Sequence, residues 1–270
     1  MRDLRAAAAV MRSIVGDKEG NLERTRRLVF QAADLGAELV LFPEASLTGY
    51  TVRQSMRPWA EPVPGPLTEA LVVLASEAGL VIAAGLVEAG RDDNCRLTQV
   101  MVGPQGLIGV HRKTHLGPTE KDLFQPGDRL AVWKYDQVRY GVQLCYEGHF
   151  PEISLAQALQ GAEVILVPHA SPREDPQDKL ERWLRYLPAR AYDNSVFLLA
   201  CNPAGDNGQG LTFAGAALIL GPKGQVLAQW SGEHETIVRA DLPAADLAAV
   251  RESRMGFFLP SRRPELYPKE

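Results

Sequence analysis

The 270-residue sequence lacks several features that would each indicate a class of protein. It has three cysteines, an odd number without close spacing, which does not make a disulfide framework. No apolar run approaches the roughly 20 residues that a membrane-spanning helix needs. The apolar stretch of residues 6–11 ends at Arg12 and is too short for the apolar segment of a signal peptide, so we interpret it as a first strand. We therefore expect no membrane contact and a cytoplasmic location.

An excess of positive charge is also missing. The chain has 29 basic and 33 acidic residues, for a net charge of −4, so no basic field favours binding to nucleic acid. Its 46% hydrophobic and 23% charged residues are typical of a globular protein that buries a sizeable core. We expect a small molecule or another protein as the partner.

Two pairs of segments within the chain are similar to each other. GAELVLFPEAS (36–46) and GAEVILVPHAS (161–171) share Gly-Ala-Glu, four apolar residues, Pro, one polar residue and Ala-Ser. Each follows a stretch with helical apolar spacing, which predicts a unit of helix, tight turn and buried strand. In 100–113 and 218–230, Gly-Pro-x-Gly stands between two strand-like runs and predicts a hairpin.

These repeated patterns predict the fold class. Apolar strands that alternate with helices indicate an α/β protein whose sheets are covered on both faces. The similar segments span the chain, and no low-complexity linker separates them. We therefore predict a single domain, residues 1–270, with internal pseudo-symmetry.

Three polar residues have the same setting at the ends of predicted strands. Glu44, Lys113 and Cys145 each lie at or just past the carboxyl end of an apolar run. Singly, each has an ordinary interpretation: a solvated acid, a surface lysine and a core cysteine. Ligand crevices form at the carboxyl ends of strands in covered sheets. The three matching positions therefore predict one shared pocket.

The segments around these residues carry a resemblance to a known family. LFPEASLTGY (41–50), HRKTHL (111–116) and GVQLCYEGHFPE (141–152), in that order, resemble the three signature segments of the nitrilase superfamily of carbon-nitrogen hydrolases. The resemblance continues to RRPELY (262–267) and so covers nearly the whole chain. It implies a four-layer αββα sandwich with internal pseudo-two-fold symmetry, a homodimer or higher homo-oligomer, and no cofactor.

The resemblance also implies that Glu44, Lys113 and Cys145 are catalytic. In this chemistry Cys145 is the nucleophile that forms a thioester, and Glu44 accepts and returns its proton. Lys113 and the backbone N–H of Tyr146 stabilise the oxyanion. Glu120 matches a second carboxylate, expected to hold Lys113 and tune proton transfer. The charge of Lys113 favours the thiolate whereas Glu44 opposes it, which favours a proton shared between acid and thiol.

Four further residues are expected to bind substrate: Tyr50, Tyr146, His149 and His169. By the internal repeat, His169 occupies the place that Glu44 has in the first half. It is therefore expected either to line the pocket or to be a hydrogen-bonded structural histidine, and both alternatives stay open.

Other residues near the motifs are expected to support the pocket. Glu147, Arg190, Asp193 and Asn194 match positions with a structural role in the family. The loop of residues 171–186, with mixed charges, is expected to border the pocket and to influence specificity.

The histidines offer two competing interpretations. His149 lies four residues after Cys145, but the Phe-Pro that follows it interrupts any helix that would bring the two side chains together. His111 and His115 have the i, i+4 spacing of metal ligands, yet no third ligand is evident. We therefore predict no metal site.

The residue after the nucleophile bears on the substrate. Cys145 is followed by Tyr146, which resembles the amidase and carbamoyl-amidase branches more than the true nitrilases. We expect hydrolysis of a non-peptide carbon-nitrogen bond, in the amide or N-carbamoyl (ureido) group of a small molecule, with release of ammonia or an amine. The alternatives are nitrile hydrolysis and a catalytically silent ligand-binding regulator on the same fold. The presence of Glu44, Lys113, Glu120 and Cys145 argues against the regulator.

Overall fold

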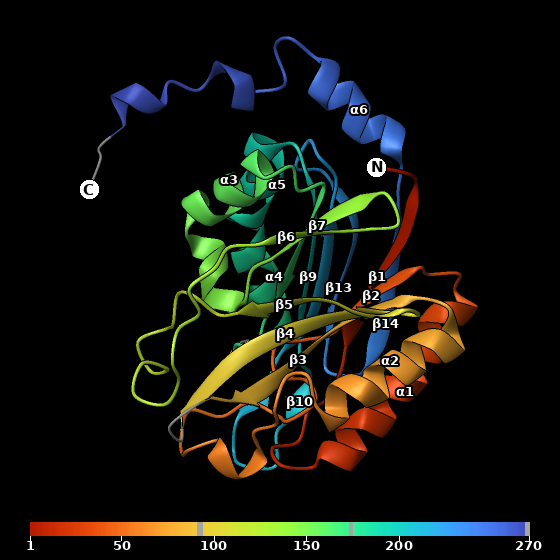
Figure 1. Cartoon of the computed structure of the whole chain (residues 1–270), viewed down its shortest axis with the longest axis vertical. Helices are drawn as coiled ribbons and strands as arrows, with labels where there is room; N and C mark the ends of the chain where they lie inside the picture. The colour runs from red at the N-terminus through yellow and green to blue at the C-terminus, as the bar shows by residue number, and fades with distance from the viewer. Residues whose placement is uncertain (91–93, 173–174, 268–270) are drawn as a thin grey trace.

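Two six-stranded sheets share a core in the computed structural model, which describes residues 1–90, 94–172 and 175–267 (Figure 1). The first sheet has the order β14-β1-β2-β3-β4-β5, with β1 (Leu4–Val10), β2 (Leu39–Leu41), β3 (Val81–Ala89), β4 (Cys95–Gly103), β5 (Gly106–Arg112) and β14 (Thr236–Leu242). The second has the order β13-β12-β9-β8-β7-β6, with β6 (Val132–Tyr135), β7 (Val138–Val142), β8 (Val164–Pro168), β9 (Phe197–Asn202), β12 (Gly215–Leu220) and β13 (Val226–Gly232). A small ribbon pairs β10 (Gly205–Asp206) with β11 (Thr212–Phe213).

The two sheets follow one plan. In each, three parallel strands form the centre, β1-β2-β3 in the first and β7-β8-β9 in the second. An antiparallel hairpin, β4-β5 or β12-β13, flanks one side, and a single antiparallel strand, β14 or β6, flanks the other. The similar sequence segments fall on β2 and β8 and on the two hairpins, so the predicted internal pseudo-two-fold symmetry is confirmed.

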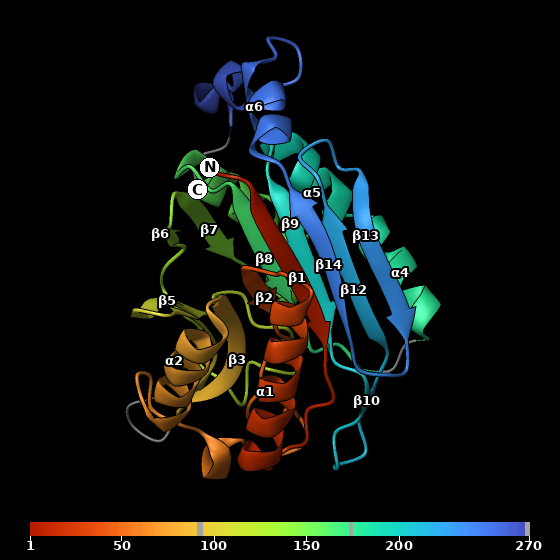
Figure 2. The ribbon, with the colours of Figure 1, turned by 90° about the vertical axis from the view of Figure 1, so that its right-hand side faces the viewer.

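Helices cover the outer face of each sheet (Figure 2). α1 (Lys18–Asp34) and α2 (Pro66–Ala78) pack on the first sheet, and α3 (Pro151–Leu159), α4 (Pro176–Leu184) and α5 (Leu187–Asn194) lie on the second. The layers are therefore helix, sheet, sheet and helix, as predicted.

Strand β1 shows why the sequence adopts this arrangement. Side chains alternate between the two faces of a strand. Ala6 and Ala8 accordingly join the core between the sheets, whereas Ala7 and Ala9 join the core beneath the helices. An apolar run at the N-terminus is thus explained by a strand buried on both faces.

The C-terminal segment leaves the body of the molecule. After α6 (Ala244–Glu252) the chain runs outward through two short 3₁₀ helices, η3 (Leu259–Ser261) and η4 (Pro264–Leu266) (Figure 1). It exposes apolar side chains, including Met255 and Leu266, which are 87% and 64% exposed. Among the described residues, no helix combines the length and apolar character needed to cross a bilayer.

Candidate active site

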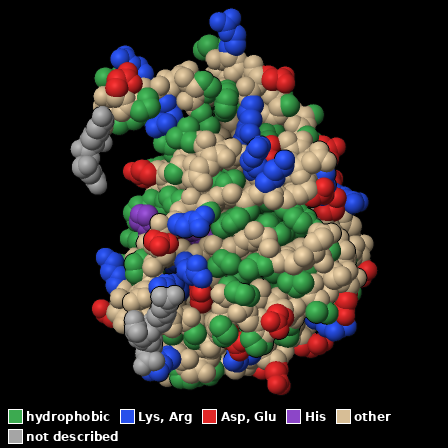
Figure 3. Space-filling view, viewed as in Figure 1, with side chains coloured by type: hydrophobic (Ala, Val, Ile, Leu, Met, Phe, Trp, Pro, Cys, Tyr) green, Lys and Arg blue, Asp and Glu red, His purple; other side chains and the backbone are tan. Residues whose placement is uncertain are grey.

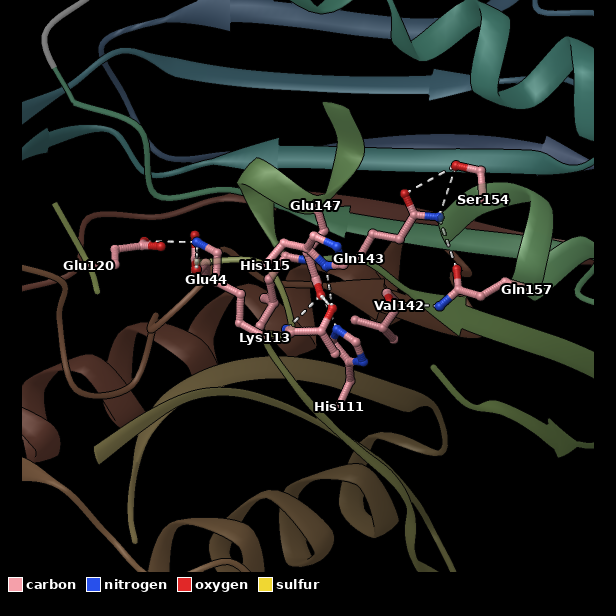
Figure 4. A network of polar contacts seen from close by, with 12 residues as sticks. Glu44, His111, Lys113, His115, Glu120, Val142, Gln143, Glu147, Ser154 and Gln157 are labelled. Carbon is pink, nitrogen blue, oxygen red and sulfur yellow. Dashed lines mark hydrogen bonds and ion pairs between the residues drawn. The ribbon is translucent and has the colours of Figure 1, made fainter. Parts of the chain in front are cut away.

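Lys113 stands between two buried carboxylates. Its Nζ lies 2.9 Å from Oε1 of Glu44 and 2.8 Å from Oε1 of Glu120 (Figure 4). Lys113 directly follows β5, and Glu44 lies three residues after the end of β2. The two strands run in the same direction in the first sheet, with β3 and β4 between them, so their carboxyl ends lie at the same edge. All three side chains are almost fully buried. The structure therefore brings together three of the four predicted catalytic side chains.

Glu120 is held by two further hydrogen bonds. The hydroxyl of Tyr50 donates to Oε1 at 2.8 Å, and the backbone N–H of Gly117 donates to Oε2 at 2.7 Å. Tyr50 is buried, and its hydroxyl is engaged by Glu120. In the structure Tyr50 therefore positions the carboxylate that orients Lys113.

Cys145 lies on a strained turn beyond β7. Its φ is +47°, in the left-handed region that residues with a side chain rarely adopt, and it begins the 3₁₀ helix η2 (Cys145–His149). Such a conformation costs roughly 1–3 kcal/mol and is common at functional sites. Cys145 is half-buried, and its Sγ lies 3.2 Å from Oγ of Ser171, whose backbone N–H donates to Oδ1 of Asn202. The turn thus presents the thiol beside the end of β8.

The charges at the site favour a protonated thiol with a nearby base. Burial, aided by Glu120, raises the pKa of Glu44 to about 7, although Lys113 opposes the change. Burial and the charge of Glu44 raise the pKa of Cys145 against the opposing effect of Lys113. Burial alone would lower the pKa of Lys113, but Glu44 and Glu120 outweigh it and raise that pKa, so the ammonium stays charged.

One oxygen of Glu44 is left for chemistry. Oε2 of Glu44 is buried and has no hydrogen-bond partner within the described part of the chain. Buried polar atoms are nearly always paired, so an orphan acceptor at a strand end marks a place for a proton or a substrate group. Glu44 and Lys113 act in opposite directions on the pKa of Cys145. Together with the unpaired oxygen of Glu44, this opposition supports the expected sharing of a proton between acid and thiol.

Glu147 connects the turn that carries Cys145 to the loop after Lys113 through hydrogen bonds. Its carboxylate accepts hydrogen bonds from the backbone N–H of Leu144 at 2.6 Å, from Thr114 through N–H and hydroxyl, and from Nε2 of His111 at 2.7 Å (Figure 4). Burial opposes ionisation, but His111 and the hydrogen bonds outweigh it and lower the pKa of Glu147 to about 2. The buried carboxylate therefore couples the position of Lys113 to that of Cys145.

The two histidines with metal-ligand spacing have partners of another kind. His111 is paired with Glu147, and Nδ1 of His115 lies 2.8 Å from the hydroxyl of Thr114. In the described residues no group of three His, Cys, Asp or Glu side chains is placed to hold a metal ion.

Arg190 binds the carboxyl end of η2. Its guanidinium donates to the carbonyl oxygens of Gly148 and His149, each at 3.1 Å. Asn194 in turn donates to the carbonyl of Arg190 at 2.9 Å, while Asp193 lies exposed on α5. Arg190 and Asn194 thus support the turn of the nucleophile, as the sequence indicates.

His169 and His149 both contact the side chain of Tyr186. Nδ1 of His169 donates to the carbonyl of Val167 at 2.8 Å, and its Nε2 accepts from the hydroxyl of Tyr186 at 3.2 Å. Both ring nitrogens of His169 are thus engaged, which favours the structural alternative over substrate binding. The exposed ring of His149 stacks on Tyr186 with centroids 4.3 Å apart.

A cavity of about 500 Å³ adjoins Thr114 and Tyr146, the residues that directly follow Lys113 and Cys145 in the chain. Tyr146 lines this cavity, whereas Glu44, Lys113, Glu120 and Cys145 are not among its lining residues. The lining comes from the segments that follow Lys113 and Cys145 and consists of Thr114, His115, Leu116, Pro118, Lys121, Phe124, Pro126, Tyr146 and Phe150. On the face shown in Figure 3, acidic and basic side chains are interspersed, in keeping with the slightly negative net charge.

Two side chains near the thiol were not among the predicted site residues. Ser171 contacts Sγ of Cys145, and Lys179 of α4 is buried with its charge acting on the thiol. Both belong to the 171–186 segment expected to border the pocket, of which residues 173–174 lie outside the described chain. A signal for Lys179 existed, because it lies four residues before Trp183 and so on the same, buried face of a helix.

Comparison with known proteins decides the family. Residues 5–252 match the family model of carbon-nitrogen hydrolases. The chain belongs to the carbon-nitrogen hydrolase family. This hydrolase is 32% identical to a nitrilase of Pyrococcus abyssi over 98% of its own length and 99% of that protein. It is 31% identical to an N-carbamoylputrescine amidase of Solanum lycopersicum, covering 96% of this chain and 92% of that one.

Solved structures of an amidase from Nesterenkonia sp. share the fold of this hydrolase. One matches with a TM-score of 0.83 and 27% identity, over 97% of this chain and 94% of the amidase. Other structures of that amidase show covalent addition of the acetamide moiety of fluoroacetamide at its active-site cysteine, and a complex of a mutant with butyramide. The likeness extends over the whole four-layer sandwich.

Proposed function

We propose that this hydrolase cleaves the amide or N-carbamoyl group of a small molecule through a thioester on Cys145. The observation that carries the proposal is the buried cluster of Glu44, Lys113 and Glu120, in which the charges of Glu44 and Lys113 act on a strained cysteine at the end of the second sheet. Support comes from the Nesterenkonia amidase, with its butyramide complex, and from the N-carbamoylputrescine amidase of tomato.

Acylation begins with the proton of the thiol. Glu44, whose pKa lies near 7, accepts this proton as Sγ of Cys145 attacks the carbonyl carbon. The oxyanion that forms receives the charge of Lys113 and a hydrogen bond from the backbone N–H of Tyr146, and each such donor is worth roughly 10²–10³ in rate. Glu44 then returns the proton to the departing nitrogen, and ammonia or an amine leaves.

Deacylation uses the same groups in reverse order. Glu44, again a carboxylate, takes a proton from a water molecule. The oxygen of this water attacks the thioester carbon. The second oxyanion collapses, the bond between carbon and Sγ breaks, and the proton returns to the thiolate of Cys145. Glu120 holds Lys113 in place through both steps, because its hydrogen bond to Nζ does not depend on the protonation of Glu44.

A panel of substrates tests this function. We expect release of ammonia or amine from butyramide and N-carbamoylputrescine, with slower turnover of butyronitrile, and no turnover by Cys145→Ala. Butyronitrile as the best substrate would favour the nitrilase alternative. Silence over the panel, together with stabilisation of the fold by a ligand in thermal-shift assays, would favour the regulator.

The C-terminal segment supports a homodimer or higher homo-oligomer. Residues 253–267 leave the body of the chain and expose Met255, Phe258, Leu266 and Tyr267. Apolar side chains on an extended segment are suited to packing against a second copy. Sedimentation at micromolar concentration is expected to show a species larger than the 29.5 kDa chain, and a 29.5 kDa species would contradict the proposal.

Two further proposals concern the chain as a whole. The sheets share a core to which strands from both halves contribute, which supports a single domain over residues 1–270. The three cysteines are free, which supports a reducing compartment such as the cytoplasm. Limited proteolysis tests the single domain and is expected to give no stable half-length fragment. Fractionation of cells tests the location and is expected to find the protein in the cytoplasm.

A further inference from the structure

The serine that ends each of the two similar segments has a different role in each half of the chain. Ser46 is fully buried, and its hydroxyl donates to the carbonyl of Gly85 at 3.4 Å and accepts from the N–H of Gly85 at 3.2 Å. It thereby holds the loop after β2 against β3. Ser171, at the equivalent position after β8, is half-buried, and its hydroxyl lies 3.2 Å from Sγ of Cys145.

Asn202 performs the structural task in the second half. This residue ends β9 and is fully buried. Its Oδ1 accepts from the N–H of Ser171 at 2.9 Å, and its Nδ2 donates to the carbonyl of Ser171 at 3.2 Å and to that of Ala214 at 2.8 Å. The next residue, Pro172, forms a β-bridge with Phe213. The backbone of Ser171 is therefore fixed without its hydroxyl, and the hydroxyl is directed at the sulfur.

The sulfur of Cys145 needs a donor at two points of the proposed reaction. A thiol is a weak donor, whereas a thiolate can only accept hydrogen bonds. Sγ carries negative charge when Glu44 has taken its proton, and again when the bond between carbon and sulfur breaks in deacylation. The hydroxyl of Ser171 can rotate to accept from the thiol and to donate to the thiolate. Hydrogen bonds to a charged acceptor are stronger than those between neutral groups.

We propose that Ser171 is a catalytic residue that donates a hydrogen bond to the thiolate of Cys145, and that Asn202 is the positioning residue for Ser171. This inference rests on the proposed function, in which Cys145 is the nucleophile. The proton of the hydroxyl stays on Oγ throughout, so the proton of the thiol still passes to Glu44. Lys113 stabilises the charge that forms on the substrate oxygen, and Ser171 stabilises the charge on the sulfur.

The charged groups around the sulfur allow the effect of the hydroxyl to be isolated. Burial and Glu44 raise the pKa of Cys145, whereas Lys113, Lys179 and the contact with Ser171 lower it. Ser171→Ala removes the hydroxyl and leaves all three charged side chains in place. We therefore expect a smaller fraction of thiolate at neutral pH in this variant.

The rate of alkylation at Cys145 measures this fraction. The second-order rate constant for iodoacetamide is determined by peptide mass mapping from neutral to alkaline pH, for wild type and Ser171→Ala. The variant should react about 3- to 10-fold more slowly at about pH 7 and as fast as the wild type at alkaline pH, where both thiols are ionised. Equal rate constants at every pH would overturn the inference. A decrease of the same size at every pH would show altered access to the thiol, and it would overturn the inference as well.

Two further variants separate the hydroxyl from other effects. Ser171→Thr keeps a hydroxyl and should stay within about 3-fold of the wild type at about pH 7. Alkylation as slow as that of Ser171→Ala would contradict the role of the hydroxyl. Ser231→Ala in β13 removes the hydroxyl of another half-buried serine and is the matched control, with alkylation expected to equal that of the wild type.

Turnover of butyramide gives the catalytic consequence. Ser171→Ala should lower kcat about 10-fold and leave KM nearly unchanged, because the sulfur becomes charged only after the amide has bound. An unchanged kcat would contradict catalysis by Ser171. Alkylation needs no substrate, so it tests the contact with the sulfur even if the wild type hydrolyses no amide. That last result would instead overturn the proposed function, and the two failures are therefore distinguishable.

Discussion

The ammonium of Lys113 lies 2.9 Å from Oε1 of Glu44, with both side chains 1% exposed. Even so, burial holds the pKa of Glu44 at about 7, and burial raises that of the neighbouring Cys145 thiol. Glu44 and Cys145 therefore titrate as a pair, and the pair with one proton is the form that can attack a carbonyl carbon. The buried lysine keeps Glu44 partly ionised near neutrality and leaves its second oxygen free to act as the base.

This pairing predicts the pH dependence of the reaction. We expect kcat/KM for a neutral amide to rise through about pH 7, as the pair loses its first proton. It should fall again at alkaline pH, above the ordinary pKa range of a thiol, as the second proton leaves. Glu44→Gln removes the base and should lower kcat by at least about 10²-fold, in line with typical contributions of acid-base catalysis. Full activity at pH 5 would contradict the role of Glu44.

Glu147 is predicted to matter for both stability and rate. Its folded pKa of about 2 lies below the unfolded value, so its contribution to the free energy of unfolding is complete above the unfolded pKa and is lost as the pH falls towards 2. Glu147→Gln should lower the free energy of unfolding by about 1.5–3 kcal/mol at neutral pH, because charge-assisted hydrogen bonds are lost. It should also lower kcat more than it changes KM. Urea unfolding and steady-state kinetics measure the two effects.

The control for this prediction is pH. Towards pH 2 the wild type loses the contribution of Glu147, so the stability difference between wild type and Glu147→Gln should shrink. A difference that stays constant from neutral pH to pH 2 would show that the variant acts through packing and not through the carboxylate.

Gly85 is predicted to set the position of Glu44. A Cβ at Gly85 would lie 2.3 Å from the backbone N of Ala45 and 2.8 Å from the carbonyl oxygen of Pro43. These are backbone atoms on either side of Glu44, and they cannot move without displacing it. Gly85→Ala should therefore destabilise the fold by about 1–3 kcal/mol and lower kcat at least about 10-fold.

A second glycine serves as the control. A Cβ at Gly256, in the C-terminal segment, meets the side-chain oxygen of Ser253 at 3.0 Å, which can rotate away. Gly256→Ala should leave kcat and stability close to those of the wild type. Equal kinetics for Gly85→Ala and Gly256→Ala would mean that the loop of Glu44 tolerates displacement.

Much of the fold follows from local patterns in the sequence. Apolar continuity alone predicts several strands. It is seen in the run of alanines in β1 and in the apolar runs that form β2 and β8 after the two Gly-Ala-Glu segments. Glu44, Lys113 and Cys145 are predictable as a group because each lies within three residues of the end of such a strand. Their meeting requires no more than that the strands lie in packed sheets.

The partners of individual side chains are harder to predict. The contact between Tyr50 and Glu120 joins residues 70 positions apart, and His169 and Tyr186 are separated in the chain by α4. Tyr50 is expected to bind substrate, and His169 either to line the pocket or to be a structural histidine; in the structure Tyr50 contacts Glu120, and His169 contacts Val167 and Tyr186. Lys179 was missed because nothing in its immediate sequence shows that the charge faces inward; only the periodicity with Trp183 indicates this.

The order of cysteine modification follows from exposure. Cys145 is half-buried, whereas Cys95 and Cys201 are 3% and 0% exposed. Limiting iodoacetamide followed by peptide mass mapping should therefore label Cys145 before the other two. Earlier labelling of Cys95 or Cys201 would contradict the accessibility of the nucleophile.

The same samples test the thioester mechanism most directly. Residual release of ammonia from butyramide is measured in each sample and plotted against the fraction of Cys145 that is alkylated. If Sγ of Cys145 is the nucleophile, activity falls in direct proportion and reaches zero when Cys145 is fully alkylated. Undiminished turnover by enzyme with fully alkylated Cys145 would contradict the thioester and the function proposed from it.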